Sequence, residues 1–231
     1  MSESSVQAGA LPKAPSGVSM IVVMTSVATV CGLLIVTAFQ ATKGAIEHNV
    51  ATITQESVLE ILPGAARQIP FGVDAAGAVV REPAADADVS RIYAGYDESG
   101  ALLGIAIEGR GQGWNELKIL YAYSPDRQCI FGFKVLECRE TPGVGDKITT
   151  QEDFLANFKE LDATLDPATQ SPVHPIVTVK HGTKKDKWEI DAISGATISS
   201  KAIGRILQES TTRLLPAITG HLDEIRKAGA A

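Results

Sequence analysis

The stretch RIYAGYDESGALLGIAIE (residues 91–108) predicts a β-hairpin, and this hairpin decides the fold class. Arg91–Asp97 and Ala101–Glu108 are both rich in residues that favour strands. Between them, Asp97–Gly100 has the composition of a tight turn, in which Gly100 can adopt a positive φ. The fold is therefore expected to contain antiparallel strands that are neighbours in the sequence.

Two further strand pairs are predicted downstream of this hairpin. Leu117–Tyr123 and Gln128–Cys138 flank the turn Ser124–Asp126. Pro175–Lys180 and Lys187–Ile190 flank a polar turn and predict another hairpin. Upstream, residues 65–88 carry two prolines and two glycines among many alanines, so this part is expected to be irregular, with room for one short strand.

Helical patterns lie on both sides of these strands. Four segments are predicted as helices: Ile46–Leu62, Gln151–Phe158, Ile198–Leu214 and Pro216–Lys227. Antiparallel strands in succession, with helices gathered at the ends, indicate one α+β domain.

The apolar segment Val18–Phe39 contains no charged residue. About 22 residues of helix are long enough to cross the roughly 30 Å hydrocarbon core of a membrane. A cleaved signal peptide is the main alternative, but no small-residue cleavage site follows the segment, so an uncleaved anchor is expected. Lys13 and Lys43 lie on opposite sides of it, so charge does not indicate the orientation.

Composition excludes several classes of function. The 231 residues have a formal net charge of −6 without a dense basic run, so nucleic acid is not expected as a partner. The aromatic content of 5% argues against a large aromatic-lined pocket.

Neither the cysteines nor the histidines have the spacing of a metal site. No CxxC pair occurs among Cys31, Cys129 and Cys138. The histidines are scattered, and surface or turn positions are expected for His48, His174, His181 and His221. Neither a metal site nor a catalytic group of the chain's own is predicted.

The most informative motif is DAISGATIS (residues 191–199), which lies between a predicted strand and a predicted helix. Its small residues expose hydroxyl groups on a close-packed turn, and the amides that open the helix favour a bound phosphate. From these local features alone, simple capping of the helix by Ser and Thr is the better interpretation.

This motif resembles the flavinylation motif of the FMN-binding domain family. The resemblance places Thr197 at the acceptor position, where the hydroxyl is joined to FMN through a phosphoester. It implies that a separate Mg-dependent flavin transferase takes the FMN moiety from FAD, because a threonine hydroxyl is a poor nucleophile without a base. The other positions that it assigns to the FMN site are Asp191, Ser194, Gly195, Ala196 and Ser199.

A second motif, ETPGVGDK (residues 140–147), predicts a rigid turn when it is taken alone. It also resembles a signature loop of the G subunit of Rnf-type ion-translocating electron transport complexes. Upstream, Gly109, Gly111 and Gly113 precede Trp114, where that family has a glycine-rich loop. The resemblance adds the following residues to the FMN site: Glu140, Thr141, Pro142, Gly143, Val144 and Trp114. Whether Trp114 stacks on the flavin or fills the core is open at this point.

The resemblance implies an electron-transfer protein that works with the other subunits of an ion-translocating ferredoxin:NAD oxidoreductase. It implies a single-pass protein of the bacterial inner (cytoplasmic) membrane. The expected divisions are a disordered cytoplasmic tail (1–17), a transmembrane helix (18–39), a linking helix (40–64) and an extracytoplasmic FMN-binding domain (65–231).

Two alternatives remain. One is the C subunit of the Na⁺-translocating NADH:quinone oxidoreductase, which shares the acceptor motif. The other is a membrane-tethered scaffold domain without a cofactor.

Overall fold

The computed structural model describes residues 16–84, 87–139, 143 and 145–230. The chain divides into two compact units, one ending at Ala51 and the other beginning at Thr52. A single helix, α1 (Gly17–Ile61), contributes to both units. Each unit is described by itself.

The first unit consists of the larger part of α1. This helix is long and apolar enough to cross a membrane. Its apolar side chains between Val18 and Phe39 are exposed, as is expected of side chains that contact lipid. It includes the predicted transmembrane segment, and the same helix continues through most of the predicted linking segment.

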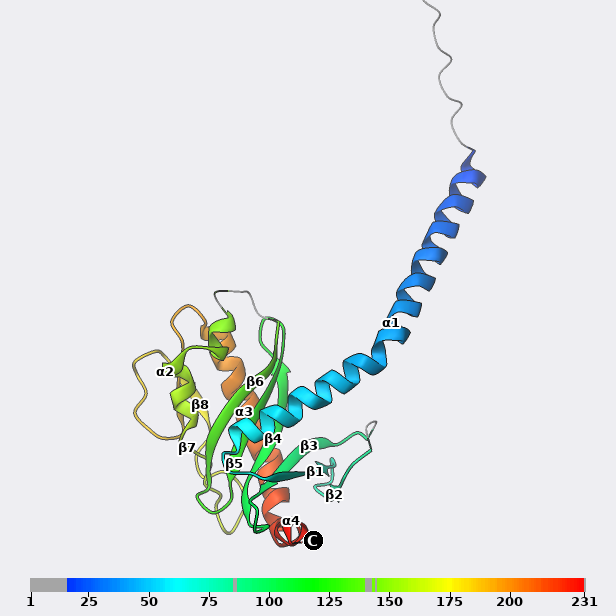
Figure 1. Cartoon of the computed structure of the whole chain (residues 1–231). Coiled ribbons are helices and arrows are strands. Elements are labelled where there is room, and N and C mark those ends of the chain that lie inside the picture. Colours follow the sequence, from blue (N-terminus) through cyan, green and yellow to red (C-terminus); the bar gives the residue numbers. More distant parts are fainter. Residues whose placement is uncertain (1–15, 85–86, 140–142, 144, 231) are drawn as a thin grey trace, which may run out of the picture. The chain divides into compact units, whose positions relative to one another are not determined.

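The second unit is built around a seven-stranded antiparallel sheet with the order β2-β1-β3-β4-β5-β6-β7 (Figure 1). Its strands are β1 (Arg67–Val73), β2 (Val79–Arg81), β3 (Ser90–Tyr96), β4 (Leu102–Gln112), β5 (Glu116–Ser124), β6 (Cys129–Cys138) and β7 (Leu161–Asp162). A two-stranded sheet, β8 (Val177–Val179) and β9 (Glu189–Asp191), lies apart from it. The remaining elements are η1 (Gly145–Thr149), α2 (Glu152–Leu155), η2 (Ala156–Phe158), α3 (Thr197–Gly220) and α4 (Leu222–Gly229). The predicted α+β class is confirmed.

The two faces of the large sheet are covered by different elements. Because side chains alternate along a strand, Ile105 and Ile107 of β4 enter the larger apolar core beneath α3, whereas Ala106 enters a smaller one. The smaller core contains Val58 and Leu62, which lie at the end of α1 and directly after it. The helix α4 is joined to β3 by a hydrogen bond, in which the Tyr96 hydroxyl donates to the carbonyl of Ile225 (2.6 Å).

The β3–β4 and β5–β6 hairpins are confirmed by their antiparallel pairing. Cys129 and Cys138 lie at opposite ends of β6. Burial raises the pKa of the Cys129 thiol.

The predicted glycine-rich loop is wrong in part, because Gly109 and Gly111 lie inside β4. A Cβ atom on Gly111 would lie 2.5 Å from Cγ1 of Ile206, so these glycines allow α3 to pack closely on the strand.

Three other predictions are wrong. Residues 65–88 contain two strands, β1 and β2. Pro70 is tolerated in β1 because β2 pairs only with Phe71–Val73. The β8–β9 pair is parallel instead of a hairpin. The connection from residue 180 to 188 is long enough to return the chain to the start of β8.

The third error concerns Pro216, which does not end α3. Proline inside a helix costs about 3 kcal/mol. Leu214, Leu215 and Ile218 are buried around it, and their burial offsets that cost. The helix ends instead at Gly220, and His221 separates α3 from α4.

Candidate functional site

The β9–α3 loop (Ala192–Ala196) contains the centre of the DAISGATIS motif. Gly195 has a φ of +84°, and a Cβ atom there would meet nothing within 4 Å, so the loop is open to solvent at this point. Thr197 is the first residue of α3, and its side chain is exposed. Ala196 occupies the N-cap position, without a capping side chain. The interpretation of this motif as a simple Ser/Thr helix cap is therefore wrong.

The other residues of the motif are divided between surface and interior. Ser194 is exposed, whereas Ala196 and Ser199 are buried. Ile198 follows Thr197 and leaves 48% of its surface exposed. Thr197 therefore lies beside an exposed apolar side chain at the opening turn of a helix, where the positive end of the helix dipole favours negative charge.

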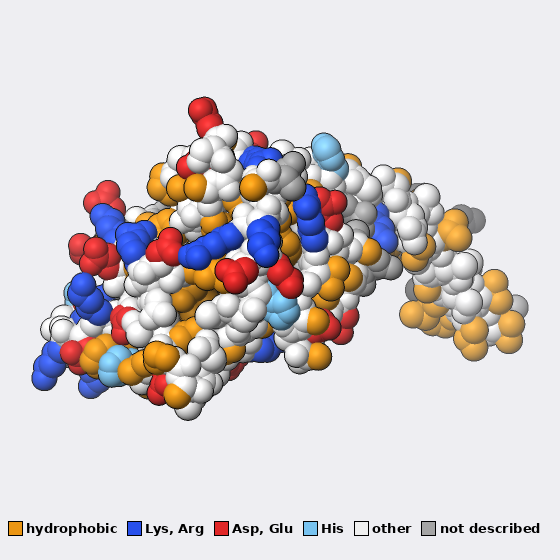
Figure 2. All heavy atoms as spheres, turned by 90° about the horizontal axis from the view of Figure 1, so that it is seen from below, with side chains coloured by type: hydrophobic (Ala, Val, Ile, Leu, Met, Phe, Trp, Pro, Cys, Tyr) orange, Lys and Arg blue, Asp and Glu red, His pale blue; other side chains and the backbone are white. Residues whose placement is uncertain are grey.

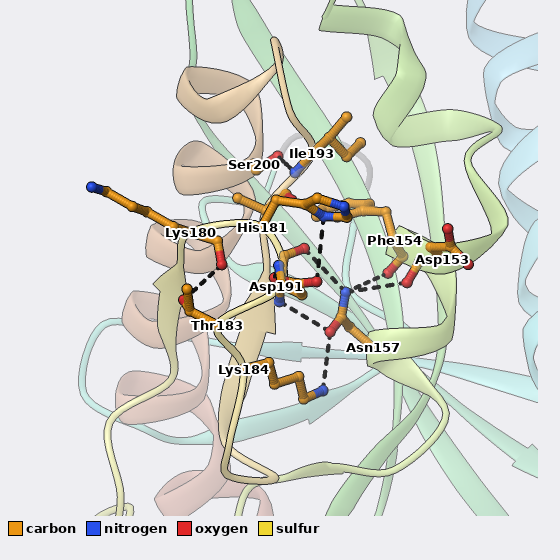
Figure 3. A network of polar contacts seen from close by, with 12 residues as sticks. Asp153, Phe154, Asn157, Lys180, His181, Thr183, Lys184, Asp191, Ile193 and Ser200 are labelled. Atoms are coloured by element: carbon orange, nitrogen blue, oxygen red, sulfur yellow. Dashed lines mark hydrogen bonds and ion pairs between the residues drawn. The ribbon is translucent and has the colours of Figure 1, made fainter.

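Asp191 faces the turn that follows β8 (Figure 3). Its Oδ1 accepts a hydrogen bond from the backbone N–H of Gly182 (2.7 Å). Nδ1 of His181 lies 3.4 Å from Asp191 Oδ2 and 3.1 Å from the carbonyl oxygen of Ala192. The structure thus brings His181 to the motif, a proximity that the sequence pattern does not show because His181 and Asp191 are ten positions apart.

Asn157 holds the backbone of Asp191 from the other side (Figure 3). Its Oδ1 accepts the N–H of Asp191 (3.0 Å), and its Nδ2 donates to the Asp191 carbonyl (3.3 Å) and to the Phe154 carbonyl (3.0 Å). Asn157 is only 6% exposed, so this amide serves as a buried clamp. A single Asn in a short helical segment gave no sequence signal for this role.

Lys184 completes the network by donating from Nζ to Asn157 Oδ1 (3.0 Å). Burial lowers the pKa of the Lys184 ammonium, while the carboxylates of Asp191 and Glu189 act in the opposite direction. The positive charge polarises the Asn157 amide and strengthens the donation from its Nδ2 to the Asp191 carbonyl. On the face of the molecule that Figure 2 shows, basic and acidic side chains are interspersed.

Trp114 lies in the β4–β5 turn and is 67% exposed, so it does not fill the core. Arg205 of α3 donates from Nη2 to the carbonyl of Gln112 (2.6 Å), directly before this turn. Asn115 Nδ2 donates to the carbonyl of Arg139 (2.8 Å). The turn is therefore fixed both to α3 and to the residue that precedes the second motif.

The second motif is described only in part. Gly143 is an exposed turn residue, and Gly145 begins η1, which packs against α3. The other predicted site residues of this motif lie outside the described residues: Glu140, Thr141, Pro142 and Val144.

A cavity of about 650 Å³ lies away from the motif. It is formed by β3, the segment before it, β4 and the middle of α3, and its charged lining includes Arg91, Glu108 and Arg213. Within the described part of the chain, none of the predicted site positions lines this cavity. The predicted site is instead an open surface around the start of α3.

The chain is similar to several known proteins. A family model described as "FMN-binding domain" matches residues 113–212. The chain is 32% identical over 185 residues to the G subunit of the ion-translocating oxidoreductase complex of Methanosarcina acetivorans, covering 80% of this chain and 87% of the relative. It is 25% identical over 198 residues to the protein of the same name from Pasteurella multocida, covering 84% and 91%.

Two solved structures share the fold. The crystal structure of Shewanella oneidensis NqrC matches with a TM-score of 0.54 and 21% identity, over 75% of this chain and 96% of that one. The C subunit of the Na⁺-translocating NADH-quinone reductase of Parabacteroides distasonis matches with a TM-score of 0.50 and 21% identity, over 70% and 78%.

Proposed function

Because this chain belongs to the family of the G subunit of ion-translocating oxidoreductase complexes, we propose that it carries FMN covalently on Thr197 and passes electrons within a membrane complex. The chain is a redox subunit with an FMN-binding domain and works beside other subunits. The observation that best supports covalent attachment is the exposed side chain of Thr197. It lies on the opening turn of α3, within the region that matches the FMN-binding domain.

The residues around Thr197 fit a flavin phosphate. The positive end of the α3 dipole favours a phosphate group at this position. Lys201 is exposed one helical turn further on, and residues four apart lie on the same face of a helix, so its ammonium group is available to neutralise the ester. Gly195 adds no side chain that would block the approach.

The attachment reaction is a phosphoryl-group transfer without oxidation or reduction. The bond between Thr197 Oγ1 and phosphorus forms as a pyrophosphate P–O bond of FAD breaks. AMP leaves, and the hydroxyl proton passes to a base of the transferase. The open surface around Thr197 supports transfer by a separate enzyme, because a second protein can reach the hydroxyl there.

We propose that two exposed apolar side chains contact the flavin ring system. Trp114 and Ile198 are exposed, and aromatic side chains stack well on planar rings. We assign the same role of contacting the flavin to the loop that contains Glu140, Thr141, Pro142, Gly143 and Val144. When bound, FMN supplies the one- and two-electron chemistry, and the chain supplies tethering and orientation.

The membrane placement extends this proposal. The helix α1 could span a membrane. We propose a single crossing by residues 18–39, with residues 1–17 in the cytoplasm and the domain from residue 65 onward outside it. The complex as a whole would transfer electrons between ferredoxin and NAD. The cofactor-free scaffold is disfavoured by the FMN-binding match, whereas the C subunit of the Na⁺-translocating NADH:quinone oxidoreductase shares the fold.

Replacement of the hydroxyl tests the attachment. The full-length chain, produced in membranes with a flavin transferase, should give a band that fluoresces under ultraviolet light after denaturing electrophoresis. Thr197→Val should abolish the band. Thr212→Val, at an exposed position of the same helix, should leave it unchanged.

Mass analysis of the peptide that contains residue 197 gives the decisive comparison. The wild-type peptide should carry the added mass of FMN minus one water. Fluorescence that persists in Thr197→Val would move the attachment elsewhere, and an unmodified wild-type peptide from native membranes would refute a covalent flavin.

A further inference from the structure

Ser200 has an arrangement of hydrogen bonds that ordinary helix geometry does not require. Its side chain is fully buried, at 0% exposure, in the first turn of α3. The hydroxyl donates to the carbonyl of Ala196 (2.9 Å) and accepts the backbone N–H of Ile193 (3.1 Å). The second contact is drawn in Figure 3.

The first of these bonds is common, because a serine in a helix often donates to the carbonyl four residues earlier. The second is not a helical bond, since Ile193 precedes the helix and lies in the β9–α3 loop. Ile193 is itself only 2% exposed, so its N–H would be buried without a partner if the Ser200 hydroxyl were removed. The hydroxyl therefore joins the beginning of this loop to its end.

Backbone bonds close the same loop. The N–H of Ala196 donates to the carbonyl of Ile193 (3.1 Å), and the N–H of Ser200 donates to the carbonyl of Ala196 (2.9 Å). Between the two closed ends, only Ser194 and Gly195 project into solvent. Thr197 follows immediately, so its position depends on the hydrogen bonds that join Ile193, Ala196 and Ser200.

We infer that Ser200 is a positioning residue for flavin attachment: its buried hydroxyl holds the Ile193–Ala196 turn in the shape that presents the Thr197 hydroxyl to a flavin transferase. This role rests on the proposed function of Thr197. Ser200 is buried beneath the loop and acts through it, without contact with the flavin or the transferase.

Ser210 provides a matched control on the same helix. It is also buried, at 7% exposure, and its hydroxyl is hydrogen-bonded to the Tyr121 hydroxyl (2.7 Å). Ser210→Ala therefore removes a buried serine hydrogen bond from α3, as Ser200→Ala does, but it lies three turns away from the β9–α3 loop. The two substitutions should have similar effects on the thermal unfolding midpoint.

The experiment uses the full-length chain in detergent, purified without flavin, together with a purified flavin transferase, FAD and Mg²⁺. Mass spectrometry follows the gain of FMN mass under saturating transferase. Ser200→Ala should lower the maximal transfer rate by about tenfold or more, because two bonds that fix the loop are lost. Ser210→Ala should stay within about twofold of the wild type, since hydrogen bonds near the loop are intact.

Hydrogen exchange in the flavin-free chain supplies a second measurement. The Ile193 amide should exchange faster in Ser200→Ala than in the wild type, and at the wild-type rate in Ser210→Ala. If Ser200→Ala does not fold, Ser200→Cys replaces it. Cysteine fills a similar volume but bonds weakly, and the same loss of rate is expected.

The outcomes separate this inference from the function on which it rests. A wild-type chain that gains no flavin mass from the transferase refutes the covalent attachment itself. A wild-type chain that is modified normally, with equal transfer rates for Ser200→Ala and Ser210→Ala, overturns the positioning role of Ser200 and leaves Thr197 as the attachment site.

Discussion

The β3–β6 meander and the segment from β8 to the start of α3 both contribute side chains to the apolar core, but they differ in how far side-chain hydrogen bonds fix their backbone. In the meander, long strands pair with their neighbours in sequence, and side chains such as Ile105, Ile107 and Ile119 are fully buried. In the second segment, β8 and β9 have three residues each. Ile190 of β9 is fully buried, and Asn157 and Asp191 add side-chain hydrogen bonds to backbone groups of other segments.

This difference gives the two regions different roles: the meander stabilises the fold, and the segment before α3 sets the position of the candidate attachment residue. Apolar burial contributes free energy broadly but fixes the direction of a side chain only loosely. Hydrogen bonds from Asn157, Asp191 and Ser200 contribute less free energy, but they fix particular backbone atoms. The residue proposed to receive the flavin follows the segment that is organised by hydrogen bonds, and it is anchored through α3 to the apolar core.

The largest expected effect comes from the meander. Ile107→Ala removes a fully buried side chain, and such substitutions lower the free energy of unfolding by about 2–5 kcal/mol. Leu103→Ala, on the same strand but at 36% exposure, should cost much less. Urea unfolding of the full-length chain in detergent, followed by near-ultraviolet circular dichroism, measures both. Equal costs for the two substitutions would contradict the assignment of the meander as the stabilising core.

A smaller effect is expected at the buried amide clamp. Asn157→Leu keeps a similar volume but leaves the N–H of Asp191 without its partner, which should cost about 1–3 kcal/mol of unfolding free energy. Hydrogen exchange should accelerate at Asp191 and remain unchanged at Ile105 in the meander. Asn115→Leu is the control, because Asn115 is exposed and holds a carbonyl at the surface. Uniform acceleration in both regions would show that the clamp belongs to the global core.

The two regions also differ in how well sequence predicts them. The β3–β4 and β5–β6 hairpins follow from local alternation and turn composition, and both predictions are confirmed. The β8–β9 pair has the same local appearance, yet its strands are parallel. Strand direction there depends on the path of the connection, which no short pattern encodes. Similarly, Pro216 predicted a helix end because proline has a low helix propensity. That propensity takes no account of the burial of Leu214 and Ile218, which stabilises the helix around the proline.

The motif predicts where the candidate site lies in the sequence, but it does not predict which residues of the fold support that site. The positions of Thr197 and Gly195, in an exposed loop at the start of a helix, agree with what the motif requires. Asn157 and His181 were missed, because each reaches the motif through tertiary structure instead of sequence spacing. Trp114 could be assigned to the surface only once its exposure was known.

The smallest expected effect separates the geometry of Asp191 from its charge. Asp191→Ala removes the acceptor for the Gly182 N–H and should cost about 1 kcal/mol of unfolding free energy, because the bond lies at the surface. Asp191→Asn keeps an oxygen at the same place and loses only the charge that faces His181, so it should remain within about 0.5 kcal/mol of the wild type. Urea unfolding of both variants measures the difference. Equal destabilisation would mean that the negative charge, and not the bond to Gly182, holds the turn against β9, and the segment would then depend on electrostatics that salt can screen.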